Sequence, residues 1–299
     1  MSTPDSLGVT ADRPAVRALF QGLFDDAAVF PPGLAPLPQA VRDHVARQSS
    51  PYADLVGPLL LPVSAIADLL NLEHPPLEIA LVSRPGTSLA LVGEALSALR
   101  ERPGVTVAGV EVGWSAGWQQ SATWGQLTPG PDGGGILRSI EVPRGLGLED
   151  ALSDIHAHAD DVNLVQAKFR TGSIPERPAP TAVELATFIR ASVDHELSFK
   201  LTGGLHHAIS RTAPTGEHEV GFLNVIAATR WALAHGAEVP EMESLLSGHD
   251  PAPIVDIITR MSGADASVLR AFFTSYGCCG VMDPIRDLAT LGLIEENAL

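Results

Sequence analysis

The stretch LSFKLTGGLHH, residues 197 to 207, combines an alternating apolar pattern with a lysine and a pair of glycines. Its odd positions from 197 to 201 are Leu, Phe and Leu, so in a strand they share one face and Lys200 lies on the other. Only two of the nineteen basic residues of the chain are lysines, Lys200 and Lys168. An amine, unlike a guanidinium, can lose its proton near neutral pH and act as a nucleophile or a base. We therefore expect the chemistry of this protein to need an amine at both positions.

The second lysine belongs to a similar pattern in VQAKFRTGS, residues 165 to 173. There Val, Ala and Phe alternate with Gln, Lys168 and Arg170, so the polar side chains share the face opposite the apolar ones. The same alternation turns Glu111 and Glu141 away from the apolar faces of two earlier runs. We expect these four ionisable groups, the two lysines and the two glutamates, to converge at the carboxyl ends of neighbouring strands.

Short apolar runs alternate along the chain with amphipathic segments, which is typical of buried strands joined by helices. The expected strands are residues 27–30, 58–63, 78–83, 107–112, 137–142, 163–168, 197–202 and 271–277. The expected helices are residues 38–48, 64–72, 88–102, 147–160, 181–194, 219–236 and 284–291.

Eight such units predict a closed α/β barrel of the (β/α)8 type, formed by residues 1–299 as a single domain with an N-terminal helix. Residues 205–269 are too long for one crossover, and we interpret them as a helical insertion after the seventh strand. Residues 113–135 lack a helical pattern and contain three tryptophans, so we expect a loop there. An open, doubly wound sheet is the alternative architecture.

Composition limits the classes of partner. The formal charge of −16 argues against nucleic acid or an anionic membrane surface, because both need a basic face. The N-terminus has no signal-peptide pattern and no run of eighteen apolar residues occurs, so we expect a cytoplasmic protein that binds a small molecule. The two cysteines, Cys278 and Cys279, are adjacent, and we interpret them as free thiols. Whether the chain forms a homo-oligomer is left open.

A pair of buried lysines has a specific chemical consequence. Two ammonium groups close together and partly removed from water disfavour the charged form of one of them, so its pKa falls. The deprotonated amine can then form an imine with a carbonyl substrate, while the second lysine stays protonated. The alternative interpretation is a structural ion pair between lysine and glutamate that closes the barrel without chemistry.

Residues 162–204 resemble the region of deoxyribose-phosphate aldolase, a class I aldolase with a (β/α)8 barrel, that runs from the sixth strand to the seventh. The family's Schiff-base lysine lies in a Lys-x-x-Thr-Gly setting, which KFRTG from Lys168 to Gly172 matches. Its second lysine precedes a Gly-Gly pair, which FKLTGG from Phe199 to Gly204 matches. The spacing between the two lysines is also similar.

The resemblance implies that Lys168 forms the imine and that Lys200 lowers its pKa, without any cofactor. It implies that Glu111 stands where the family has a proton-relay aspartate. The Gly203-Gly204 turn would offer backbone N–H groups to an anion such as a phosphate.

The whole chain is also similar to a group of bacterial proteins without an assigned function. The matching pieces are FDDA (24–27), FPP (30–32), GLHH (204–207), GFLN (221–224) and SYGCC (275–279). In that group a histidine usually precedes the GFLN element, whereas this chain has Val220.

Several further residues are candidates for substrate binding. His206 and His207 follow the glycine turn, where they can act as acid, base or anion ligand, or hold a metal together with residues such as Asp26, Glu141, His218 or Cys279. The remaining substrate-binding candidates are Arg170, whose guanidinium suits a carboxylate or phosphate, Thr171, Gly203 and Gly204.

The leading hypothesis is a lyase of the class I aldolase type. Lys168 is its nucleophile, and Lys200, Glu111 and Glu141 are the other catalytic residues. The substrate is a small carbonyl compound that can carry a phosphate or a carboxylate. A metal-dependent hydrolase or isomerase and a non-catalytic binding barrel are the alternatives.

Overall fold

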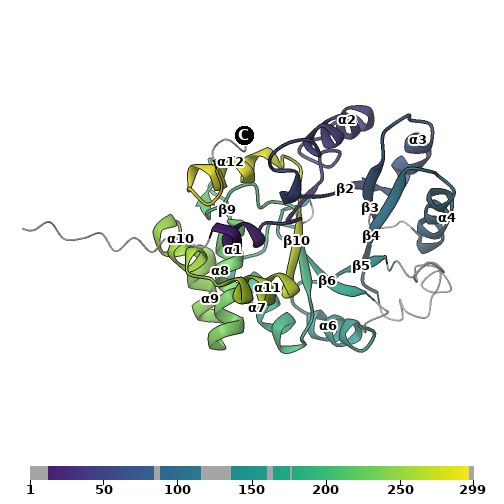
Figure 1. Ribbon diagram of the computed structural model, residues 1–299. Coiled ribbons are helices and arrows are strands. Elements are labelled where there is room, and N and C mark those ends of the chain that lie inside the picture. Colours follow the sequence, from purple (N-terminus) through teal and green to yellow (C-terminus); the bar gives the residue numbers. More distant parts are fainter. Residues whose placement is uncertain (1–12, 84–87, 116–135, 160–163, 176, 296–299) are drawn as a thin grey trace, which may run out of the picture.

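The computed structural model describes residues 13–83, 88–115, 136–159, 164–175 and 177–295 (Figure 1). Eight parallel strands form a closed barrel in the order β1-β10-β7-β6-β5-β4-β3-β2. Their bounds are β1 Phe24–Asp26, β2 Val56–Pro62, β3 Leu77–Val82, β4 Val105–Gly113, β5 Leu137–Glu141, β6 Val165–Arg170, β7 Phe199–Thr202 and β10 Phe273–Cys278. The predicted (β/α)8 class is confirmed, and the open sheet is wrong.

Helices lie outside the ring of strands (Figure 1). They are α1 Arg13–Ala18, α2 Leu37–Arg47, α3 Ile66–Leu70, α4 Leu89–Arg100, α6 Leu148–His156, α7 Ala182–Asp194, α8 Phe222–His235, α9 Val239–Ser247, α10 Pro251–Thr259, α11 Gly263–Phe272 and α12 Met282–Thr290. Local signals explain several boundaries: α7, for example, begins at a capping box between Thr181 and Glu184. None of the helices in the described part of the chain is long and apolar enough to cross a membrane.

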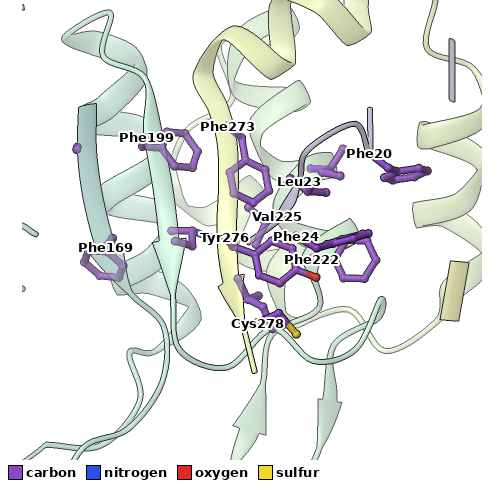
Figure 2. Packing of buried hydrophobic residues seen from close by; sticks show 14 of the residues in the cluster. Phe20, Leu23, Phe24, Phe169, Phe199, Phe222, Val225, Phe273, Tyr276 and Cys278 are labelled. Carbon is purple, nitrogen blue, oxygen red and sulfur yellow. The ribbon is translucent and has the colours of Figure 1, made fainter. Parts of the chain in front are cut away.

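The outward faces of the strands form the main core with these helices. Phe169 on β6 stacks on Phe188 of α7 with ring centroids 4.5 Å apart, and Phe199 on β7 stacks on Phe273 of β10 at 5.4 Å. Figure 2 shows Phe169, Phe199 and Phe273 within this packing. The apolar face of each strand is thereby buried against helices, and the opposite face of β6 and β7 points into the barrel.

The first strand differs from its prediction. It spans Phe24–Asp26, whereas residues 27–30, where we expected it, form a turn region. The strand holds two buried aspartates because each finds cationic partners: Asp25 points into the barrel and Asp26 points out towards α2. The other seven expected strands overlap the observed ones.

The segment between β7 and β10 starts with a short antiparallel pair, β8 Arg211–Thr212 and β9 His218–Glu219, and continues with α8 to α11. The sequence predicts a helical insertion here and does not predict the two-stranded pair. Of the tryptophan-containing loop, Trp114 packs against the main core and donates a hydrogen bond to Asp154 at 3.2 Å. The rest of that loop, from residue 116 to 135, lies outside the described residues.

Candidate active site

The two lysines lie next to each other inside the barrel. Lys168 on β6 and Lys200 on β7 are register partners in the parallel ladder, and both side chains are buried. The alternation of side chains along each strand predicts this placement, because Phe169 and Leu201 lie on the outward face, in the main core.

Glu111, on β4, bridges the two amines. Its Oε2 lies 2.6 Å from Nζ of Lys168, and its Oε1 accepts a hydrogen bond of 2.5 Å from Nζ of Lys200. Glu111 is 2% exposed, so water contributes little to stabilising the charge of its carboxylate. One carboxylate therefore holds both ammonium groups in a single buried cluster.

The cluster continues in both directions as a chain of alternating charges. On one side, Glu141 on β5 lies 2.9 Å from Nζ of Lys168 and 3.0 Å from Nε of Arg170. On the other side, Lys200 donates to Oδ2 of Asp25 at 2.6 Å, and Ser275 Oγ donates to the same oxygen at 2.8 Å. Three cations thus alternate with three carboxylates along five strands.

This arrangement shifts the pKa values of its members. Burial by itself raises the pKa of Glu111, but the ammonium groups of Lys168 and Lys200 outweigh it and lower that pKa to about 2. Burial also acts to raise the pKa of Glu141, but Lys168 and Arg170 outweigh it and lower that pKa. Burial raises the pKa of Asp25, and its ion pair with Lys200 offsets this only in part. Asp25 is therefore the carboxylate of the cluster whose pKa is raised, in contrast to Glu111 and Glu141.

The pKa of Lys200 is raised, as expected for the lysine that stays protonated. Burial acts to lower the pKa of Lys200, but the carboxylates of Asp25 and Glu111 outweigh it and raise that pKa. The reason is that the closed barrel brings Glu111 of β4 between the two amines, so each ammonium contacts a carboxylate. Lys200 is thus a cation at neutral pH.

A cavity of about 700 Å³ opens over this cluster at the carboxyl ends of the strands. Lys168, Glu111 and Glu141 line it, whereas Lys200 lines a second cavity of about 200 Å³ that Asp25 and Ser275 share. Glu111 lies at both cavities. Lys168 is therefore the amine that a molecule in the large cavity meets, and Lys200 is behind it.

Two loops form one side of the large cavity. The φ angles of Gly203 and Gly204 are +73° and +75°, which glycine adopts without strain. A Cβ on Gly172 would lie 3.0 Å from the carbonyl carbon of Gly203, so the loop after β6 and the loop after β7 pack backbone against backbone. Thr171 secures this contact because its hydroxyl donates to the carbonyl of Gly203.

Most of the expected binding residues line the large cavity. They are Arg170, Thr171, Gly203, Gly204, His206 and His207. Asp26 is the exception: its Oδ2 lies 2.6 Å from NH1 of Arg47 and 3.0 Å from Nδ1 of His44, both on α2. Because strand β1 begins three residues earlier than expected, Asp26 falls on the outward face and joins the barrel to α2.

His206 contacts both cysteines at the rim of the cavity. Its Nε2 lies 3.4 Å from Sγ of Cys279, and its Nδ1 lies 3.7 Å from Sγ of Cys278. Burial lowers the pKa of His206 and raises the pKa of both thiols, so these groups are mainly uncharged at neutral pH. Within the parts of the chain that the structure describes, no three His, Cys, Asp or Glu side chains gather as a metal site.

Sequence reasoning missed Asp25 and Ser275 as members of the charged cluster. Asp25 lies between Phe24 and Asp26. Because two charged residues stand next to each other, the pattern of polar and apolar residues does not show which aspartate faces the lumen. The signal that could have found it is the buried aromatic Phe24, which fixes the outward face and therefore turns its neighbour inwards.

Fold and site together define a (β/α)8 barrel with a cavity at the carboxyl ends of its strands and a buried cluster of two lysines and three carboxylates in its lumen. This fold is commonly that of an enzyme, with its active site at this end of the barrel. The chain matches none of the protein-family models and none of the curated proteins with which it was compared.

Proposed function

We propose that the protein is a lyase of the class I aldolase type, which acts on a small carbonyl compound through an imine at Lys168. The observation that carries this proposal is the position of one buried amine at a large cavity, between two carboxylates and beside a second buried lysine. The resemblance of the Lys168 and Lys200 segments to deoxyribose-phosphate aldolase supports the same chemistry.

Imine formation begins when Nζ of Lys168 loses a proton and adds to the carbonyl carbon of the substrate. Glu141 is suited to accept that proton, since its carboxylate lies 2.9 Å from Nζ and also lines the cavity. A carbon–nitrogen bond forms, the carbonyl oxygen takes up protons, and it leaves as water. The product is a protonated imine attached to Lys168.

The protonated imine keeps the positive charge where the ammonium was. Glu111 and Glu141 therefore stabilise it without rearrangement, which is the condition for effective electrostatic stabilisation in a buried site. In the cleavage direction, the bond between the α and β carbons breaks and its electron pair moves towards the nitrogen, which gives an enamine. The proton of the β-hydroxyl passes to a carboxylate, and the new carbonyl compound leaves. Protonation of the enamine and addition of water then release the second product and restore Lys168.

Lys200 supports these reaction steps although it does not line the large cavity. It holds Glu111 and Asp25 by hydrogen bonds of 2.5 and 2.6 Å, so it fixes the carboxylate that faces the imine. Its raised pKa keeps it charged at neutral pH, and burial raises the pKa of the neighbouring Asp25 above its ordinary value. Lys200 thus acts as a positioning residue that holds Glu111 in place beside the imine.

Two guanidinium groups at the cavity suit a substrate with an acidic group. Arg170 and Arg177 both line it, and Arg170 is held by Glu141 at 3.0 Å. Among the described residues, Arg177 forms no ion pair. A carboxylate or phosphate on the substrate would therefore meet an available cation there.

The test is reductive trapping. The protein is incubated with a panel of aldehydes and ketones plus borohydride, and the adduct is located by intact mass and peptide mapping. Only Lys168, Lys200 and the N-terminal amine can form imines, so the assignment is direct. We expect a substrate-dependent adduct on Lys168 that disappears in Lys168→Arg, which keeps the charge between Glu111 and Glu141.

The N-terminal amine serves as the internal reference for non-specific reaction. Lys200→Arg is the matched variant, because it changes the neighbouring lysine in the same way and leaves the nucleophile in place. An adduct that is equally abundant in Lys168→Arg and in the unchanged protein would show that imine chemistry at Lys168 is wrong.

A further inference from the structure

The wall of the large cavity has two chemically different halves. Strands β4 to β7 contribute the charged groups, from Glu111 to Lys168 and Arg170. Strands β2 and β3 and the turn after β1 contribute a separate apolar cluster, which does not belong to the main core of the protein. Its members are Ala27, Leu60, Ala80 and Val82, with Phe30 packed against them.

This apolar cluster faces the reactive amine across the barrel. In the ring of eight strands, β2 stands four places from β6, so Leu60 and Lys168 come from opposite walls. Leu60, Val82 and Phe30 all line the same cavity as Lys168. A molecule that reaches Lys168 with one end can therefore place its other end on apolar side chains.

The size of the cavity exceeds what a three-carbon aldehyde needs. About 700 Å³ is the space of roughly two dozen water molecules at about 30 Å³ each, and pockets of this size hold ligands as large as drugs. A compact sugar-like substrate would leave the apolar half in contact with water, which costs free energy because apolar surface is poorly hydrated.

We propose that the substrates are carbonyl compounds with an extended apolar substituent, an alkyl chain or an aryl ring, rather than polyhydroxylated ones. The substituent lies against Ala27, Phe30, Leu60 and Val82 while the carbonyl carbon meets Lys168. The proposal rests on the proposed function for the reacting end, and it assigns to Leu60 and Val82 the role of determining specificity.

The first experiment compares trapping rates at Lys168 for aldehydes with equal numbers of heavy atoms. Pentanal and glyceraldehyde form such a pair, and a series from propanal to heptanal with benzaldehyde tests length and shape. We expect the adduct rate at Lys168, normalised to that of the N-terminal amine, to rise about fourfold per methylene, the ratio for burying one CH₂ group. Equal rates for pentanal and glyceraldehyde would overturn the proposal and leave the imine mechanism intact.

A pair of variants locates the specificity. Val82→Thr keeps the shape of the side chain and adds a hydroxyl to the cavity wall, so we expect the preference for pentanal over glyceraldehyde to fall severalfold. Val268→Thr, at a position on α11 that is 54% exposed, is the matched control and should leave the preference unchanged. An identical preference in Val82→Thr and Val268→Thr would contradict the assignment of Val82.

A second measurement needs no imine. Calorimetry with pentan-1-ol and glycerol, again matched in heavy atoms, tests binding to the cavity alone. We expect only the alkyl alcohol to bind measurably, with the negative heat-capacity change of apolar burial. Binding of pentan-1-ol together with no adduct from any carbonyl would reject the proposed function and retain the apolar site. Glycerol binding as tightly as pentan-1-ol would reject the apolar site.

Discussion

Replacement of Glu111 by glutamine tests the central feature of the site, because it removes one charge and keeps the shape of the side chain. The fall of the Glu111 pKa from 4.5 to about 2 corresponds to about 3 kcal/mol of net interaction with its surroundings. This agrees with the cost of removing one partner of a buried ion pair, typically about 3–5 kcal/mol. We therefore expect Glu111→Gln to lower the free energy of unfolding by about 3 kcal/mol at pH 7.

The pH dependence gives the prediction a sign. A carboxyl group with a lowered pKa in the folded state stabilises the protein fully above its unfolded pKa, and the contribution is lost as the pH falls through the folded value. For Glu111 the window runs from pH 4.5 down to about 2. Urea denaturation of both proteins should thus show a difference that is constant near neutral pH and shrinks below pH 4.5.

Two comparisons make this experiment specific. Glu94→Gln, on the exposed side of α4, removes the same charge and should change the free energy of unfolding by less than about 0.5 kcal/mol. Adding Lys200→Met to Glu111→Gln should recover part of the loss, because the excess cation goes and Asp25, with its raised pKa, can take up a proton. If Glu111→Gln is as stable as Glu94→Gln at pH 7, then the carboxylate does not bridge two buried amines.

Three further predictions test the surroundings of the site. Asp26→Asn should lower the free energy of unfolding by about 3 kcal/mol, because it breaks the 2.6 Å pair with Arg47, but leave the adduct yield in the trapping assay unchanged. Gly57→Ala should lower both the unfolding midpoint and the adduct yield, since a Cβ there would clash with Oδ1 of Asp25 and displace it. Alkylation of Cys279 should be slow at pH 7 and accelerate about tenfold per pH unit, because burial raises the pKa of its thiol; rapid alkylation at neutral pH would contradict this, and Cys279→Ser should trap carbonyl compounds normally.

The alternation of apolar and polar residues predicted much of the barrel. It identified seven of the strands, because their outward faces carry residues such as Phe199 and Leu201 that must be buried against helices. It failed at β1, where two aspartates interrupt the pattern. A buried Asp25 is compatible with a strand only when Lys200, far away in the sequence, neutralises it. No local pattern contains that information.

The same limit applies to the ionisation of the site. The alternation of side chains along each strand predicted that four residues lie on the inner face, namely Lys168, Lys200, Glu111 and Glu141. It does not predict the distances between side chains on different strands. The expectation that the amines would repel each other followed from considering them as a pair. The closed barrel instead brings Asp25 of β1 and Glu111 of β4 next to Lys200, and their carboxylates raise its pKa.

The sequence by itself determined which side chains face the lumen, because a strand has only two faces and the apolar one must leave water. It also singled out the two amines, because arginine serves elsewhere in the chain. Only the tertiary structure decided which charges touch, since burial, distance and the closing of the barrel set the energy of each ion pair. It likewise decided that one wall of the cavity is apolar, because Leu60 and Val82 meet Lys168 across a space that no strand defines alone.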